Sequence, residues 1–118
     1  MLNKTKRQQV YDKYGDHCAY CGCAIELKDM QVDHIIPKRL RRGPSVTDDF
    51  NNLNPSCRRC NHYKRASSLK TFRKVLLTLH ERVREQYICK VAEDYGIIAV
   101  VPWDGTFYFE KREYQKEA

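Results

Sequence analysis

The sequence predicts a small α+β domain that is held together by a metal ion. Two C-x2-C pairs, Cys18–Cys21 and Cys57–Cys60, are separated by 35 residues and can supply four thiolates to one ion. Apolar residues recur at spacings of three and four between residues 69 and 83, which predicts an amphipathic helix. Short apolar runs at residues 32–36 and 97–101 are typical of buried strands.

The N-terminal half of the chain alternates short elements with turns. The apolar spacing of residues 4–14 predicts a helix that ends at Gly15. The first C-x2-C pair follows in a tight turn, a zinc knuckle, and the chain then enters a short buried strand near residues 32–36. We expect residues 38–49 to form a loop, because they contain Gly and Pro and lack apolar periodicity, and residues 50–55 to continue as irregular chain.

The C-terminal half begins with helices and ends with an expected hairpin. Helices are expected over residues 58–66, 69–83 and 87–95. Ser67 or Ser68 is a suitable N-cap for the second helix, and Gly96 ends the third. Ile97–Val101 then reads as a strand, residues 103–106 as a turn, and residues 106–110 as the returning strand.

Composition and charge limit the class of protein. The 118 residues suffice for one domain, and we expect a single domain over residues 1–118. The net charge of +7 favours a polyanion as partner, and it is concentrated in residues 1–79, which carry 16 basic and 7 acidic side chains. No run of about 20 apolar residues is present, so we expect no membrane association. The N-terminus also lacks the apolar region of a signal peptide, which favours a cytoplasmic protein.

Six cysteines in such a chain indicate metal binding before disulfides. Four sulfur ligands complete the tetrahedral shell of Zn²⁺ and leave no open position, so this ion would be structural rather than catalytic. The alternative is four free or redox-active thiols. Cys23 is a spare ligand or a plain small residue beside the knuckle, and Cys89 fits the apolar face of a helix.

The residues between the two knuckles form a recognisable pattern. Cys18-x2-Cys21, Val32-Asp33-His34-Ile35-Ile36-Pro37, Asn51-Asn52-Leu53 and Cys57-x2-Cys60-Asn61-x2-Lys64 occur in this order. The pattern resembles the HNH endonucleases, and within them the zinc-containing branch with a ββα-metal (His-Me finger) core. The resemblance covers about residues 5–80 and leaves residues 81–118 as a C-terminal extension with a helix and a β-hairpin.

The resemblance implies a hydrolytic site for phosphodiesters. His34 is the expected general base, because neutral imidazole accepts a proton near pH 7. Asp33 and Asn61 are the expected ligands of a catalytic Mg²⁺ or Mn²⁺ ion, since hard divalent ions prefer oxygen donors. The third position of the motif is thus Asn rather than His. His62 is the alternative ligand to Asn61, but one helical residue further points about 100° away.

The resemblance also implies a residue that orients the histidine. Asn52 is assigned to this position, where it would hold the backbone next to His34 without touching the metal. Asn51 and Asn54 are close enough in the sequence to be alternatives.

Basic side chains surround the expected site and are expected to contact phosphates, which supply affinity with little sequence readout. They are Lys38, Arg39, Arg41, Arg42, Arg58, Arg59, Lys64 and Arg65. For Lys64, the resemblance implies a phosphate contact near the scissile bond.

The sequence therefore predicts a metal-dependent endonuclease that cleaves DNA, of bacterial or phage type, with a dimer or a partner protein supplying specificity. A catalytically inactive, zinc-stabilised nucleic-acid-binding module is the alternative, and a protein-interaction domain is a third class. The aromatic residues at positions 103 and 107–109 either cover the core or stack on a base or a partner.

Overall fold

The computed structural model describes residues 3–37 and 49–117, which form two compact units. The first unit extends to Leu69 and resumes at Phe107, and the second comprises Lys70–Thr106. The expected site residues that lie in the described part of the chain all belong to the first unit. None of the helices in residues 3–37 and 49–117 is long and apolar enough to cross a membrane.

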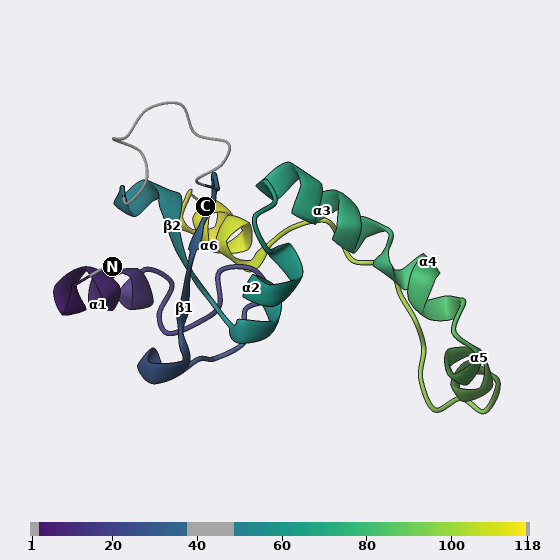
Figure 1. Cartoon of the computed structure of the whole chain (residues 1–118). Coiled ribbons are helices and arrows are strands. Elements are labelled where there is room, and N and C mark those ends of the chain that lie inside the picture. Colours follow the sequence, from purple (N-terminus) through teal and green to yellow (C-terminus); the bar gives the residue numbers. More distant parts are fainter. Residues whose placement is uncertain (1–2, 38–48, 118) are drawn as a thin grey trace. The chain divides into compact units, whose positions relative to one another are not determined.

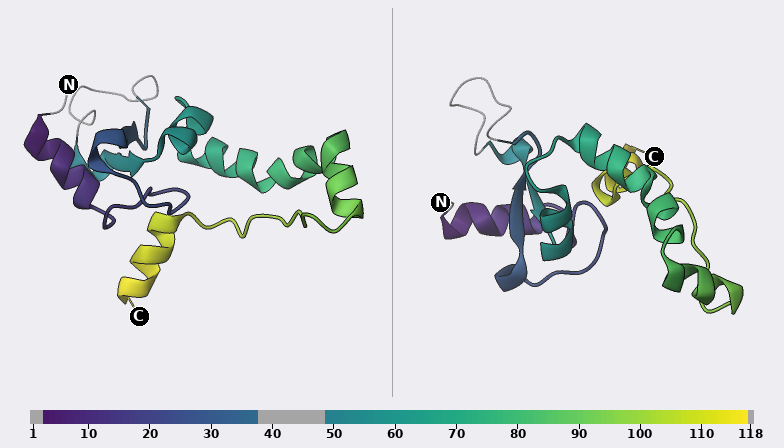
Figure 2. Two further views of the ribbon diagram at one scale, coloured as in Figure 1. Left: turned by 90° about the horizontal axis from the view of Figure 1, so that it is seen from below. Right: turned by 45° about the vertical axis from the view of Figure 1, so that its right-hand side comes forward.

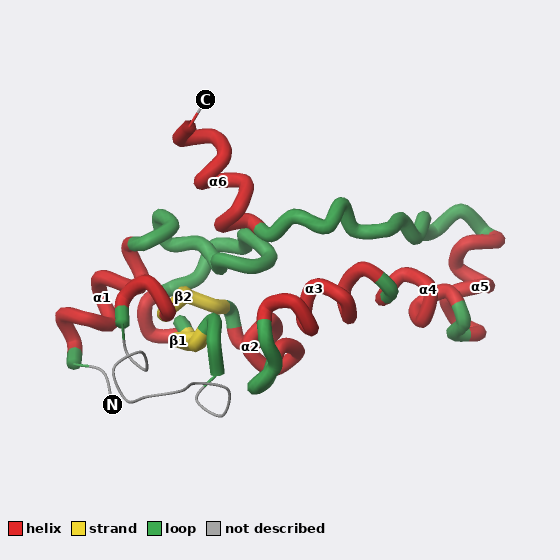
Figure 3. Tube along the Cα trace, turned by 90° about the horizontal axis from the view of Figure 1, so that it is seen from above, coloured by secondary structure: helices red, strands yellow, loops and turns green. Residues whose placement is uncertain are grey.

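The first unit consists of short helices around a two-stranded sheet, as Figures 1 and 3 show. Its elements are α1 (Lys4–Asp12), the 3-10 turn Leu27–Asp29, β1 (Gln31–His34), the 3-10 turn Phe50–Asn52, β2 (Leu53–Ser56), α2 (Arg58–Lys64) and α6 (Tyr108–Glu117). The expected helices near residues 4–14 and 58–66 and the strand near residues 32–36 are therefore present.

The core of the first unit joins α1 to the sheet. Val10 of α1 packs with Met30 and Leu53, all three at most 1% exposed. The Asn3 side chain caps α1 by accepting a hydrogen bond from the Lys6 backbone N–H at 2.8 Å. Burial of these apolar side chains fixes α1 against β2 and thereby sets the position of the segment that carries the first cysteine pair.

Strand β2 lies where the local sequence pattern predicted irregular chain, although the resemblance implied a second strand in the core. It pairs antiparallel with β1, with Val32 opposite Pro55 and His34 opposite Leu53. Asn54 and Pro55 are poor strand formers, and proline cannot donate to a ladder, so local propensity argues against a strand here. The strand forms because all four of its residues are buried, and because the Pro55 carbonyl accepts a hydrogen bond from the Ala19 N–H at 2.8 Å.

The second unit contains α3 (Leu69–Leu77), α4 (Leu79–Arg84) and α5 (Tyr87–Asp94). The single helix expected over residues 69–83 is broken at Thr78, whose hydroxyl donates to the carbonyls of Lys74 and Val75 at 3.3 Å each. Such side-chain hydrogen bonds compete with the backbone hydrogen bonds of the helix. The Arg82 guanidinium also donates to the Val75 carbonyl, at 3.0 Å. The apolar periodicity continues through the break, which is why the sequence indicated one helix.

The C-terminal hairpin expected from the sequence is wrong. Residues 97–101 form no strand, and all of them except the half-buried Val100 are exposed, with Ile97 at 74% and Val101 at 72%. The expected return strand is instead the start of α6. The first N–H groups of that helix donate to carbonyls of the first knuckle, from Tyr108 to Tyr20 at 3.1 Å and from Phe109 to Ala19 at 2.8 Å. These acceptors lie far away in the sequence, so local patterning did not reveal them.

Candidate active site and metal centre

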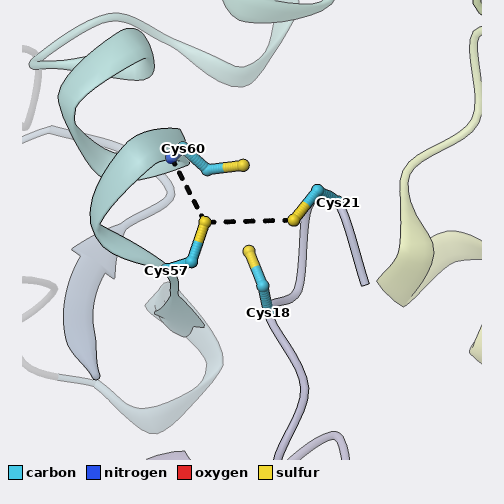
Figure 4. A group of neighbouring side chains, drawn as sticks. All are labelled: Cys18, Cys21, Cys57 and Cys60. Carbon is cyan, nitrogen blue, oxygen red and sulfur yellow. Dashed lines mark hydrogen bonds between the residues drawn. The ribbon is translucent and has the colours of Figure 1, made fainter. Parts of the chain in front are cut away.

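The two cysteine pairs meet in the first unit. The four Sγ atoms of Cys18, Cys21, Cys57 and Cys60 lie within 4.8 Å of one another, and Figure 4 shows them pointing toward a common centre. The Sγ atoms of Cys21 and Cys57 are 3.9 Å apart. A regular tetrahedron with Zn–S bonds of about 2.3 Å requires sulfur separations of about 3.8 Å. The donor set therefore fits a single zinc ion, and Cys23 lies outside this group of four.

The thiols of Cys18, Cys21 and Cys60 shift one another's pKa values. Hydrogen bonds from Cys21 and from Cys60 lower the pKa of Cys18, and the bond to Cys18 is the largest of the effects that raise the pKa of Cys60. Cys57 caps α2 by accepting a hydrogen bond from the Cys60 N–H at 3.3 Å, which places its sulfur at the N-terminus of the helix (Figure 4). The protein thus holds four sulfur donors together, and the neighbouring thiols lower the pKa of one of them, Cys18.

The first knuckle depends on Gly22. Its backbone has φ +83°, and a Cβ atom there would lie 2.6 Å from Cδ1 of Tyr108. The Gly22 N–H closes the knuckle by donating to the Cys18 carbonyl at 3.0 Å. The position therefore requires glycine for two reasons, its positive φ and the close approach of the Tyr108 ring.

A buried polar network surrounds Asp33. The Tyr20 hydroxyl donates to Oδ2 of Asp33 at 2.5 Å, and Nζ of Lys64 lies 3.1 Å from Oδ2 and 3.4 Å from Oδ1. The Asp33 side chain is only 5% exposed and that of Lys64 is not exposed. Burial raises the pKa of Asp33, while the Tyr20 hydrogen bond and the charge of Lys64 oppose the increase. The carboxylate is therefore held in place by two donors from two different elements.

Lys64 does not lie on the surface, which corrects the expectation that it contacts phosphate. Its Nζ donates to the carbonyls of His34 at 3.2 Å and Ser67 at 2.9 Å, in addition to Asp33. An ammonium group has three donors, and these three partners use all of them. Lys64 instead ties α2 to the strand that carries Asp33 and His34.

Asn52 holds the chain that follows His34. Its side-chain Oδ1 accepts a hydrogen bond from the Ile36 N–H at 2.8 Å, and its Nδ2 donates to the Ile36 carbonyl at 3.2 Å. The Asn52 carbonyl accepts from the Ile35 N–H at 2.9 Å. Asn52 is buried, whereas Asn51 is exposed. Asn54 is also buried, but its amide donates to the Tyr20 hydroxyl at 3.4 Å. Of the three asparagines considered, Asn52 is the one whose side chain contacts the backbone that follows His34.

Asn61 lies on α2 one turn before Lys64 and is half-buried. Residues three apart share a helix face, and Lys64 reaches Asp33, so Asn61 lies on the side of α2 that faces β1. Within the described part of the chain, the Asn61 side-chain amide makes no hydrogen bond, so its oxygen is available to a ligand. His62, the alternative ligand, is exposed.

Apart from the buried Lys64, the expected phosphate-binding residues divide into two groups. Arg58, Arg59 and Arg65 are exposed on α2 or at its C-terminal end. The other four expected residues lie outside the described residues: Lys38, Arg39, Arg41 and Arg42.

Two residues of the site were missed by the sequence reasoning. Tyr20 lies between the first two cysteines, and besides bonding Asp33 its ring packs edge-on against Phe107 with centroids 5.4 Å apart. Lys13 joins α1 to β2 by donating to the carbonyl of Leu53 at 2.8 Å. The local sequence around a tyrosine in a knuckle does not indicate that its hydroxyl bonds a carboxylate in a distant strand. A lysine near the end of a helix is typical of a solvated surface charge.

The family model described as "HNH endonuclease" matches residues 18–67 of the chain. Among curated relatives, the CRISPR-associated endonuclease Cas9 of Corynebacterium diphtheriae is 38% identical over 58 residues, 49% of this chain and 5% of that protein. The Septu protein PtuB of Bacillus thuringiensis is 43% identical over 49 residues, 40% of this chain and 18% of that protein. The chain thus spans less than a fifth of the length of either relative.

A solved structure resembles the chain as well. The crystal structure of the type II-C Cas9 enzyme from Actinomyces naeslundii superposes with a TM-score of 0.51 and 28% sequence identity, covering 68% of this chain and 10% of that one. The mixed arrangement of helices, a small sheet and a cysteine cluster able to hold a metal is therefore that of an HNH-type domain.

Proposed function

We propose that this chain is a metal-dependent endonuclease that hydrolyses phosphodiester bonds in DNA through a ββα-metal core formed by β1, β2 and α2. His34 acts as general base and removes the proton from the attacking water. Asn52 positions it through the backbone of β1. The observation that carries the proposal is the pair of hydrogen bonds between the Asn52 side chain and Ile36, because they hold the end of β1 where the base must be fixed.

The donor set around Asp33 supports a catalytic metal ion. An ionised carboxylate offers about four lone-pair sites, of which the Tyr20 and Lys64 contacts use three. The remaining site and the open amide oxygen of Asn61 are hard oxygen donors of the kind that Mg²⁺ or Mn²⁺ prefers. When bound, such an ion supplies charge stabilisation at the phosphate oxygens. Tyr20 and Lys64 orient the carboxylate toward this task.

Zinc has a structural role in the proposal. The Cys₄ cluster joins the first knuckle to the N-terminus of α2, and so fixes the helix that carries Asn61 relative to the strand that carries Asp33. The exposed arginines of α2 are proposed to bind the DNA backbone, which makes affinity fall steeply with salt.

The test is a plasmid-nicking assay with Mg²⁺ or Mn²⁺. His34→Ala is expected to abolish cleavage and to retain both zinc content and salt-sensitive DNA binding. Asn61→Ala is expected to require a higher Mg²⁺ concentration, whereas His62→Ala, a matched change at the exposed neighbour, keeps wild-type metal dependence. Cleavage that survives in His34→Ala refutes the base assignment.

One observation favours a catalytically inactive nucleic-acid-binding module as the second candidate. The Asp33 carboxylate already forms a buried ion pair with Lys64, against which a metal ion has to compete. This candidate predicts DNA binding without nicking by the wild-type protein at any concentration of either metal ion, and the same assay therefore separates the two functions.

A further inference from the structure

Helix α5 in the second unit exposes its apolar side. Tyr87 and Ile88 are 84% and 79% exposed, and Tyr95, directly after the helix, is 80% exposed. The opposite side carries the buried Cys89, whose thiol contacts the Glu93 carboxylate. A surface helix normally buries its apolar stripe, so this orientation indicates that the exposed side is covered by another molecule.

The segment that follows α5 is also unpartnered. Its start is attached to the helix by the Ile97 N–H, which donates to the Ala92 carbonyl at 2.9 Å. Within the described part of the chain, the N–H groups of residues 98–101 make no hydrogen bond, and the chain between α5 and α6 runs without regular structure (Figure 2). An uncharged β-branched segment with free N–H groups is a ready template for pairing with another strand.

We propose that these residues form a homodimer interface and that its occupant is a second copy of this chain. The interface, called the α5 surface below, consists of exposed apolar side chains from the helix and the segment after it: Tyr87, Ile88, Val91, Tyr95, Ile97 and Val101.

The area of the α5 surface matches that of a stable dimer. The exposed fractions of its six side chains run from 37% to 84%. With about 150–200 Å² for each fully exposed side chain, they present about 750 Å², close to the roughly 800 Å² per partner of a standard interface. A monomer with such a patch would leave one of its largest apolar areas in water.

Self-complementarity favours a second copy over another partner. In an antiparallel pair centred on Ala99, Ile97 faces Val101 of the other copy, and no like charges meet because residues 97–101 carry none. Residues 70–106 contain six basic and five acidic side chains, so two copies of this unit repel little. The same near-neutral balance disfavours a nucleic acid as occupant of this surface.

The experiment measures the mass of the zinc-loaded full chain by sedimentation equilibrium. At about 100 μM, above the micromolar upper range for interfaces of this size, we expect twice the 14.0 kDa of one chain. Tyr87→Lys and Ile97→Lys change exposed residues and are expected to give monomers. Gln9→Lys, which adds the same charge on exposed α1, is the matched control and stays dimeric.

Hydrogen exchange gives a second readout. The N–H groups of residues 98–101 are expected to be protected in the dimer and to exchange rapidly in the Tyr87→Lys monomer, while zinc content and circular dichroism match those of the Gln9→Lys control. A wild-type monomer at about 100 μM overturns the proposal, even if the surface captures a different protein. A dimer that persists in both lysine variants of the α5 surface overturns it as well.

Discussion

Replacing Lys64 by Met is expected to destabilise the protein strongly. Methionine keeps most of the volume of the buried side chain but removes the ammonium group, which leaves Asp33 as an unpaired carboxylate that is 5% exposed. Breaking a buried ion pair on one side costs about 3–5 kcal/mol. The carbonyls of His34 and Ser67 also lose their donor. Because the free energy of unfolding of a domain is about 5–15 kcal/mol, the variant should be close to unfolding at neutral pH.

The assay is urea unfolding at a fixed excess of zinc, followed by circular dichroism. Lys28→Met is the matched control, because Lys28 pairs with Glu26 at 3.5 Å while both side chains are more than 70% exposed. An exposed pair contributes less than about 1 kcal/mol. If Lys64→Met lowers the free energy of unfolding by no more than Lys28→Met does, the buried ion pair does not hold β1 to α2. The structural role assigned to Lys64 is then wrong.

The pH dependence of the same variant has a definite sign. Burial already raises the pKa of Asp33, and removal of Lys64 takes away a charge that lowers it. A carboxyl group whose pKa is higher in the folded state stabilises that state when protonated, and this stability is lost as pH rises through the folded pKa. The free energy of unfolding of Lys64→Met should therefore approach that of the wild type as pH falls and Asp33 becomes protonated. A constant difference would show that the charge on Asp33 is not its cause.

Three further changes test other parts of the first unit. Tyr20→Phe keeps the ring but removes a hydrogen bond to a buried carboxylate, and should lower the free energy of unfolding by about 1.5–3 kcal/mol in the same urea assay. Gly22→Ala should cost about 1–3 kcal/mol because of its positive φ, and more if the Tyr108 ring cannot move; a smaller cost in a Tyr108→Ala background identifies the clash. Cys57→Ser should reduce zinc from one ion per chain to almost none by elemental analysis, and chelation should unfold the first unit by circular dichroism; full folding without zinc contradicts the structural role.

The metal centre was predictable from the sequence because its four cysteines lie in two short motifs. The spacing of the four cysteines predicted their cluster, and the resemblance that placed Asn52 before Leu53 agrees with its contacts to the backbone after His34. Lys64 shows the limit of this reasoning. A lysine in a basic helix reads as a surface charge, and only the tertiary structure reveals that a carboxylate and two carbonyls surround it.

The fold was predictable where local propensity and tertiary contacts agree, as in α1 and α5. It was missed where they conflict. β2 contains Pro55 and exists because β1 and Ala19 supply its hydrogen bonds, whereas α6 exists because knuckle carbonyls accept its first N–H groups. In both cases the hydrogen-bond partners that stabilise the element lie many residues away in the sequence. The periodicity of the local sequence therefore does not reveal them.

β2 and α6 both depend on hydrogen bonds to the first knuckle, and this dependence has consequences for the site. The first knuckle donates the Ala19 N–H to the Pro55 carbonyl of β2, and its Ala19 and Tyr20 carbonyls accept the first N–H groups of α6. The Tyr20 side chain also holds Asp33. A zinc ion at this knuckle would therefore fix more than the cysteines, because three elements take their position from residues 18–21. Loss of zinc should thus disturb the Asp33 carboxylate through Tyr20 before β1 itself unfolds. The structural metal and the proposed catalytic ligand are coupled through one side chain, so zinc occupancy and cleavage should be lost together.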